Sequence, residues 1–544
     1  MPDRWEIVQN THGHPLLADI LMIHIVLLPS GKVLGFSGSE HDEKHHKKFR
    51  SVLWDPANPH VLKTLDAPHV DFFCAGHALL ADGRVLVAGG TANYNREPGN
   101  PHKPYHFTGI ADCYTFDWRT NTWLPAAPMH LARWYPTLIT LADGRVLSLG
   151  GHGGPDLPSH EVLQYEVYQP DTDRWEPARD TVPPLEDTGK FRILWWKQFP
   201  MIYYARLHVL GDGRVFSSTA LQLVGGKRRT CVLDPDTGVL SVVGPPPRGM
   251  LVAFMRNVYS RSHFTSALLP LKPPHYRQEV LIAGGRRARR FDLGAAKRRW
   301  RRAGRPRPYK MRAYATSLLL PDGSVLCIGG GESEKVPRWY WPWSEHGGYD
   351  RDSNPVPERY LPDQDAWVSG AAPADYPPIP RMYHTAAVLL PSGEVLICAS
   401  NKDSQRNSGG SRPDHGHHGE DARELRLEVY SPSYLFDAAG KPAVRPVVEL
   451  DALAAESAGY AEDLVVTTAQ PDRIRRVTMI RCSSVTHAYT SDQRLIELTI
   501  GSRGAGQITV TTPPNRRIAV PGYYLIFALD AAGVPSHGQY LRLT

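Results

Sequence analysis

A short phrase recurs seven times along this chain and restricts its fold more than any other feature. Each copy places polar residues around a glycine, continues with an apolar run such as Val-Leu-Val, and often ends in Gly-Gly. The polar-Gly pair is typical of a tight hairpin turn, because glycine accepts a positive φ, and the apolar run is typical of a buried strand. A repeat of this kind predicts the blades of a β-propeller. The copies begin at Pro29, Ala81, Ala142, Gly211, Gln278, Pro321 and Pro391.

A second pattern follows several copies and supplies the rest of each blade. An aromatic residue, a polar turn and a tryptophan occur in that order, as in Phe116 to Trp123, Tyr168 to Trp175 and Tyr360 to Trp367. We interpret the pattern as the second hairpin of a blade, with the tryptophan packed between blades. Seven blades of four strands close into a ring. The sequence therefore predicts an all-β chain in which residues 1–424 form a seven-bladed kelch-type β-propeller.

The last part of the chain has a different pattern. The repeats stop near Asn401, and from Leu425 to Leu543 short alternating strands follow one another between turns. Strands and turns over a segment of this length are typical of a sandwich of two sheets. We expect residues 425–544 to form a C-terminal immunoglobulin-like β-sandwich.

The cysteines and the chain start exclude some classes of protein. The six cysteines are scattered without a Cys-x-x-Cys pair, which argues against a zinc site or a dense disulfide framework and leaves one or two disulfides open. The apolar stretch from Ile20 to Leu28 is too short to span a bilayer. The first residues lack the apolar segment of a signal peptide. The alternatives for localisation are the cytoplasm, export by another route, and a leader already removed.

Positive charge is concentrated in one segment. The formal net charge is +7, while residues Arg286 to Lys310 contain twelve Lys or Arg and one Asp. One interpretation is a solvated outer hairpin, since blocks of like charge are usually exposed. The other is a patch for an anionic polymer or membrane surface. Because no aromatic residues alternate with the charges in a nucleic-acid motif, we expect no nucleic-acid partner.

Five cysteine, tyrosine and histidine residues are candidates for a metal site. Four of them precede the apolar strand of a repeat, where strands of different blades converge on the axis, and one lies in the tail. Two imidazoles and two phenolates form a nitrogen and oxygen donor set that suits tetragonal Cu(II). The five are Cys74 in Phe-Phe-Cys-Ala-Gly-His, Tyr135 in Arg-Trp-Tyr-Pro, Tyr383 and His384 in Arg-Met-Tyr-His-Thr, and His487 in Val-Thr-His-Ala-Tyr.

With these motifs, the chain resembles the copper-radical oxidases over nearly its whole length. The phrases Arg-Trp-Tyr-Pro and Tyr-Ser-Pro-Ser-Tyr-Leu-Phe are more similar to glyoxal oxidases than to galactose oxidase. The resemblance implies one copper ion with His384 and His487 as equatorial ligands and Tyr383 as the axial ligand. It also implies that Tyr135 is the equatorial radical tyrosine, joined to Cys74 by a thioether. His487 would reach the copper on a tail loop inserted along the propeller axis.

The resemblance further implies a two-electron oxidation. Tyr383 as tyrosinate would take the proton of the substrate hydroxyl, the Tyr135 radical would abstract hydrogen from the substrate carbon, and dioxygen would leave as hydrogen peroxide. Small aldehydes, as hydrates, are the first candidate substrates, and primary alcohols are the second. Galactose oxidase has a tryptophan over its thioether, for which Trp195 or Trp196 is the candidate here. The alternative function is a non-catalytic kelch propeller that binds a protein or polyanion partner.

Overall fold

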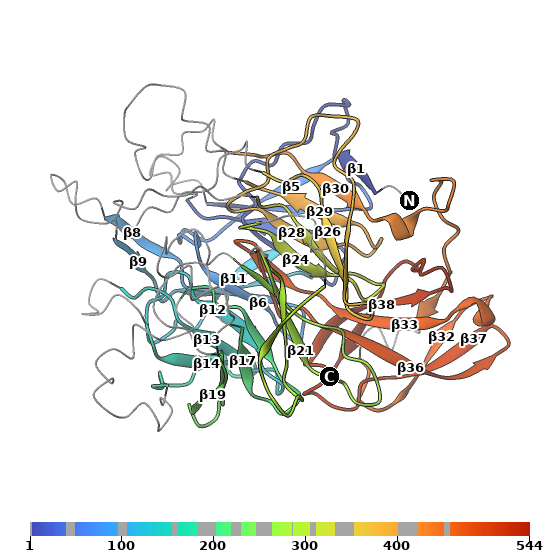
Figure 1. Ribbon diagram of the computed structural model, residues 1–544. Helices are drawn as coiled ribbons and strands as arrows, with labels where there is room; N and C mark the ends of the chain where they lie inside the picture. The colour runs from blue at the N-terminus through green and yellow to red at the C-terminus, as the bar shows by residue number, and fades with distance from the viewer. Residues whose placement is uncertain are drawn as a thin grey trace.

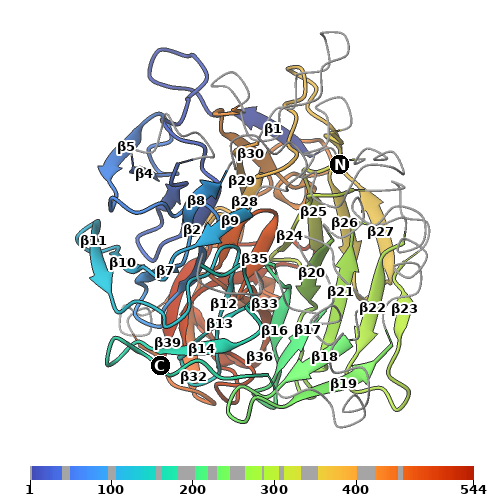
Figure 2. The same cartoon turned by 90° about the vertical axis from the view of Figure 1, so that its left-hand side faces the viewer.

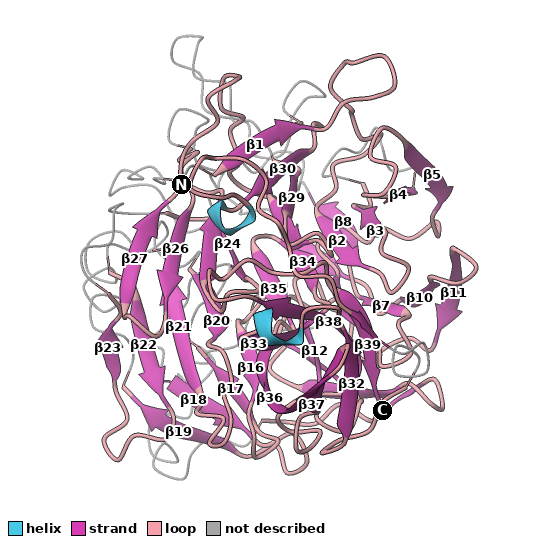
Figure 3. Cartoon of the chain, turned by 90° about the vertical axis from the view of Figure 1, so that its right-hand side faces the viewer, coloured by secondary structure: helices cyan, strands magenta, loops and turns pink. Residues whose placement is uncertain are grey.

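The computed structural model consists almost entirely of β-strands. It describes residues 3–39, 49–95, 106–154, 162–181, 203–218, 230–245, 264–284, 287–304, 312–331, 353–400, 423–450 and 457–544. Helical structure in these ranges consists of single turns such as η7 (Ser433–Leu435) and η8 (Pro471–Arg473) (Figure 3). Within the described ranges, every helix falls short of the length and apolar character that a membrane span requires.

Seven blades of four strands each make up the propeller, and the sheet of blade 1 is extended by two further strands from the tail, which confirms the predicted fold class (Figure 2). The first strands of several neighbouring blades contact one another, so they line the centre of the ring. From the first strand outward, the first four blades are β2 (His24–Leu27), β3 (Val33–Phe36), β4 (Arg50–Trp54) and β5 (Leu62–Asp66); β6 (Gly76–Leu79), β7 (Val85–Ala88), β10 (Cys113–Asp117) and β11 (Thr122–Ala126); β12 (Thr137–Thr140), β13 (Val146–Leu149), β14 (Tyr165–Gln169) and β15 (Arg174–Trp175); and β16 (Leu207–Val209), β17 (Val215–Ser217), β18 (Thr230–Leu233) and β19 (Leu240–Gly244). The last three blades are β20 (Thr265–Leu268), β21 (Glu279–Ala283), β22 (Arg289–Asp292) and β23 (Trp300–Arg302); β24 (Thr316–Leu319), β25 (Val325–Ile328), β26 (Glu358–Leu361) and β27 (Ala366–Ser369); and β28 (Ala386–Leu389), β29 (Val395–Cys398), β30 (Glu428–Ser431) and β1 (Arg4–Ile7). A separate ribbon, β8 (Thr91–Asn95) with β9 (His106–Gly109), lies between β7 and β10 in the chain.

The recurring phrase forms the turn between the first and second strands of a blade. In blade 2, Leu79 pairs with Val85 across the turn, and Gly83 has a φ of 87°. The side chain of Arg84 donates a hydrogen bond to the carboxylate of Asp82, with 2.6 Å between Nε and Oδ2. Equivalent Asp-Gly-Arg turns join β12 to β13 and β16 to β17. Local sequence therefore sets the register in which each inner hairpin pairs.

The ring closes with a strand from the N-terminal segment. Strand β1 pairs antiparallel with β30, with Arg4 opposite Ser431 and Trp5 opposite Tyr430. The sheet order β1-β30-β29-β28 makes β1 the outermost strand of blade 7. Strand β30 lies beyond the boundary predicted at residue 424, so the propeller extends at least to Ser431 in the structure.

The C-terminal residues form a nearly closed β-sandwich, as predicted (Figure 1). Its hydrophobic core is continuous with that of blades 4 and 5, because Phe216 and Leu268 belong to the same buried cluster as Met479 and Ile496. The two parts of the chain therefore share one core. The sheet order is β31 (Glu449–Leu450), β32 (Asp463–Thr467), β37 (Gln507–Thr511), β36 (Leu495–Gly504), β33 (Arg476–Arg481), β38 (Gly522–Leu529) and β39 (Gln539–Leu543).

One hairpin of the tail leaves the sandwich and enters the propeller. It consists of β34 (Ser484–Thr486) and β35 (Tyr489–Ser491), and β34 pairs antiparallel with β2. The hairpin also contacts the first strands of blades 2, 3, 6 and 7. Figure 2 shows β35 near the middle of the ring. The turn of this hairpin is His487-Ala488, so the fold carries His487 to the propeller axis.

Candidate metal centre

The residues that reach the axis share an unusual backbone conformation. We define the pre-strand position as the residue two before the first strand of a blade, or three before it in blade 4. In the described parts of blades 2, 3, 4, 6 and 7, this residue has a positive φ without being glycine. Such a conformation costs free energy and persists only where the surrounding structure imposes it. The residues are Cys74, Tyr135, Tyr204, Tyr314 and His384, with φ of 63°, 62°, 38°, 61° and 66°.

Buried ion pairs hold three of these turns in place. In blade 3, the guanidinium of Arg133 lies 2.9 Å from a carboxylate oxygen of Glu166, and both side chains are fully buried. Arg133 also donates hydrogen bonds to the backbone carbonyls of Gly150 and Gln164. Blades 6 and 7 repeat the arrangement with Arg312–Glu358 and Arg381–Glu428. Each arginine stands two residues before a tyrosine, in the order Arg-x-Tyr.

The structure brings together the five residues selected from the sequence. The hydroxyls of Tyr135 and Tyr383 are hydrogen-bonded to each other. The ring of Tyr383 stacks on that of His384, with 3.7 Å between centroids. The ring of His487 lies 4.6 Å from that of His384 and 4.9 Å from that of Tyr135. The sulfur of Cys74 is 3.6 Å from Nε2 of His487.

Contacts around the hairpin turn fix the imidazole of His487. Its Nδ1 lies 2.7 Å from the hydroxyl of Thr486, which leaves Nε2 on the side of Cys74. The amide of Ala488 donates to the carbonyl of Thr385, which follows His384. The turn is therefore tied to the blade 7 segment that carries Tyr383 and His384.

These side chains suit a copper ion better than other common metals. Four groups can donate to one ion, namely the phenol oxygens of Tyr135 and Tyr383 and the imidazoles of His384 and His487. Nitrogen and oxygen donors in this ratio favour tetragonal Cu(II). Across the described ranges, no cluster of three or more His, Cys, Asp or Glu side chains offers a different metal site.

Comparisons with known proteins show what the chain is similar to. Residues 445–543 match the family described as galactose oxidase-like, Early set domain. The chain is 25% identical to a galactose oxidase of Gibberella zeae, over 95% of this chain and 68% of the relative. It is 26% identical to the aldehyde oxidase GLOX of Vitis pseudoreticulata, over 100% of this chain and 97% of the relative.

The chain is thus similar over nearly its whole length to a galactose oxidase and to an aldehyde oxidase, and its C-terminal part matches a galactose oxidase-like domain. The predicted resemblance to these enzymes is confirmed, and the relatives that carry it are oxidases by name. The fold agrees with a solved structure of a fungal alcohol oxidase in complex with copper, at a TM-score of 0.73 and 21% identity over the full length of both chains.

A tryptophan that was not selected from the sequence as a cover lies against Tyr135. Trp134 has its ring centroid 4.0 Å from that of Tyr135, at an interplanar angle of 74°. The contact is therefore edge-on and not stacked. The predicted covers, Trp195 and Trp196, lie outside the described residues, so their role stays a prediction.

Sequence reasoning missed two tyrosines at pre-strand positions. Tyr204 lies beside both Tyr135 and His487, with its ring centroid 4.6 and 4.8 Å from theirs. Tyr314 lies 5.3 Å from Tyr383. The repeated Arg-x-Tyr motif, which includes Arg312 and Tyr314, could have indicated the second of these. No comparable signal precedes Tyr204.

Two buried histidines of blades 1 and 2 lie behind the site and are neutral. Their Nδ1 atoms are 3.4 Å apart, and the ring of His24 is 5.9 Å from that of His487. Burial lowers the pKa of His77 to about 3. Burial, followed by the nearby His77 and His384, also lowers the pKa of His24. These rings therefore add no positive charge beside the proposed ligands.

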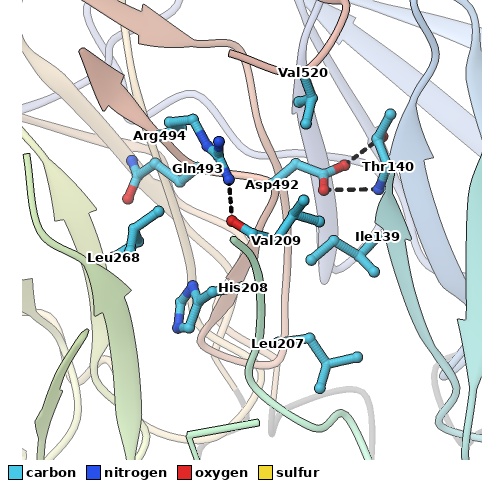
Figure 4. Close-up of a pocket in the computed structure, with 10 residues that line it drawn as sticks. All are labelled: Ile139, Thr140, Leu207, His208, Val209, Leu268, Asp492, Gln493, Arg494 and Val520. Carbon is cyan, nitrogen blue, oxygen red and sulfur yellow. Dashed lines mark hydrogen bonds between the residues drawn. The ribbon is translucent and has the colours of Figure 1, made fainter. Parts of the chain in front are cut away.

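A small polar pocket lies at the foot of the inserted hairpin (Figure 4). Its carboxylate, Asp492, directly follows β35 and accepts hydrogen bonds from the amide and hydroxyl of Thr140, at 2.9 and 2.8 Å. Arg494 donates to the carbonyl of Val209 in blade 4. The space has room for about one water molecule. We interpret this pocket as the anchor that joins the hairpin to blades 3 and 4.

Proposed function

We propose that the chain is a copper-radical oxidase that oxidises small aldehydes, as hydrates, or primary alcohols, and reduces dioxygen to hydrogen peroxide. The observation that carries the proposal is the meeting of two tyrosines and two histidines from three segments of the chain beside Cys74. A lone buried tyrosine or histidine is usually core packing. Four metal-binding groups with a thiol at one point of the propeller axis are explained better by a metal cofactor.

The roles follow from the chemistry and exposure of each side chain. Tyr135, Tyr383, His384 and His487 would hold the ion, and a bound copper would supply a one-electron redox partner and a Lewis acid for the substrate oxygen. Tyr135, cross-linked to Cys74, would hold the second oxidising equivalent and abstract hydrogen from the substrate carbon. Tyr383 is 7% exposed and Tyr135 is 0% exposed. A substrate hydroxyl would therefore meet Tyr383, which would accept its proton.

Relatives and local sequence favour small aldehydes as substrates. The match to the GLOX aldehyde oxidase covers nearly all of both chains, whereas the match to galactose oxidase covers 68% of the relative. The turn from Gly150 to Pro155 also lacks the tryptophan that the galactose oxidase resemblance leads us to expect. We therefore expect glyoxal or methylglyoxal to be oxidised faster than galactose.

Mass spectrometry after copper loading in air tests the proposal. We expect the Cys74 and Tyr135 peptides to become covalently linked with loss of two hydrogens, and the loaded protein to release peroxide with aldehydes. A Cys74→Ser variant is the control and should bind copper without forming the link. Unlinked peptides in the copper-bound, air-exposed protein would overturn the proposal and favour a binding propeller.

A further inference from the structure

Backbone and side-chain hydrogen bonds connect the pre-strand residues of blades 2, 3 and 4 in a closed ring. The amide of Tyr135 donates to the carbonyl of Cys74 at 2.9 Å, and the amide of Tyr204 donates to the carbonyl of Tyr135 at 3.1 Å. The hydroxyl of Tyr204 donates to the carbonyl of Ala75 in blade 2 at 2.7 Å. The side chain of Tyr204 therefore closes a loop that contains both Cys74 and Tyr135.

The ring of Tyr204 occupies a fixed place within this loop. It is 1% exposed and packs against the rings of both Tyr135 and His487. Because a backbone carbonyl can only accept, the phenol hydroxyl is the donor in its bond to Ala75. The guanidinium of Arg206 donates to the carbonyl of Tyr204 at 2.6 Å and holds its backbone.

The closed loop of hydrogen bonds surrounds the two residues of the proposed thioether, Cys74 in blade 2 and Tyr135 in blade 3. Joining the sulfur of Cys74 to the ring of Tyr135 requires the two groups to be held in one orientation, and such preorganisation can dominate a reaction rate. We propose that Tyr204 is a positioning residue for the Cys74–Tyr135 cross-link, and that its hydroxyl fixes the segment carrying Cys74 against Tyr135. The inference rests on the proposed function.

The cross-linking reaction balances with dioxygen as the oxidant. One S–H bond of Cys74 and one ring C–H bond of Tyr135 break, and one S–C bond forms. Two protons and two electrons leave, and they reduce one dioxygen to one hydrogen peroxide. Tyr204 is neither oxidised nor reduced in this step, so its removal should change the rate of cross-linking and leave the product unchanged.

The test is the rate of cross-linking in a Tyr204→Phe variant. Copper-free protein receives one equivalent of copper in air, and samples are quenched over time for peptide mass spectrometry. We expect the variant to form the link at least tenfold more slowly than the wild type. The matched control is Tyr524→Phe, which removes the same kind of buried bond, from a tyrosine hydroxyl to the carbonyl of Val520, in the tail. We expect this control to cross-link at the wild-type rate.

The outcomes separate this inference from the proposed function. A wild-type protein that never cross-links contradicts the proposed function. A wild-type protein and a Tyr204→Phe variant that cross-link within twofold of each other contradict only the role of Tyr204. Melting temperature and size-exclusion profiles show whether the variant is folded. If it is not, Tyr204→Met, which fills the space with a flexible side chain, is measured in the same way against the same tenfold expectation.

Discussion

At the scale of single residues, the site depends on side chains that the backbone holds in an unfavourable conformation. Cys74, Tyr135 and His384 each have a positive φ, at a cost on the order of 1–3 kcal/mol per residue. Buried Arg–Glu pairs beside two of the turns oppose this cost, because both partners lose their charge compensation if the turn relaxes. In Arg133, burial lowers the pKa of the guanidinium, and Glu166 opposes that shift. The pair is therefore a structural requirement of the turn.

We predict that Glu166→Leu strongly destabilises the protein. The substitution leaves Arg133 buried without its carboxylate, which typically lowers the free energy of unfolding by about 3–5 kcal/mol. Asp212→Ser is the control, because the Asp212–Arg214 pair is about half exposed and its loss should cost less than about 1 kcal/mol. Denaturant or thermal unfolding measures both variants. Equal losses in the two variants would mean that the buried pair has no special role.

At the scale of elements, the sequence was informative where local residues determine structure. The Asp-Gly-Arg turns predict the inner hairpins because glycine and the adjacent charges act within a few residues. Strand β1 could not be predicted, since Arg4–Ile7 contains no repeat phrase and its partner β30 is more than 400 residues away. The positive φ of Tyr204 could not be predicted either, because tertiary contacts impose it. The five proposed site residues were selected because their motifs resemble those of a known family, whereas no such motif contains Tyr204.

The hairpin of β22 and β23 is the element that tests the predicted anionic partner. Arg289 lies opposite Arg302 and Arg290 opposite Arg301, and like charges in direct opposition destabilise a strand pair. Lys297, Arg298 and Arg299 are exposed between these strands. The hairpin therefore concentrates positive charge at the outer edge of blade 5. An anionic polymer bound there would neutralise this charge.

We predict that replacing Lys297, Arg298 and Arg299 together with serine lowers the salt concentration that elutes the protein from heparin. Fewer contacts to the polyanion should also reduce the salt dependence of binding. The control removes three exposed arginines of the tail, Arg503, Arg516 and Arg517, and so changes the net charge equally. If both triple variants elute at the same salt concentration, binding follows net charge and the hairpin is not a specific surface.

At the scale of the whole molecule, the proposed copper site joins the two structural parts. The propeller supplies Tyr135, Tyr383 and His384, and the tail supplies His487 on a hairpin that is itself a strand partner of blade 1. The parts also share a hydrophobic core through residues such as Phe216 and Met479. We therefore expect the chain to unfold in one transition. Metal binding should stabilise both parts together.

Copper titration of a Cys74→Ser background tests this coupling without a contribution from the thioether. A ligand that binds only the folded state should add about 1.4 kcal/mol of stability per tenfold excess over its Kd, so the melting temperature should rise steadily with free copper. His487→Ala in this background should remove the rise, because the tail would no longer contribute a ligand. His60→Ala, at an exposed histidine bonded to the carbonyl of Gln9, should retain it. A rise that persists in the His487 variant would mean that copper binds the propeller alone. The sandwich would then be a packing partner of the site and not part of it.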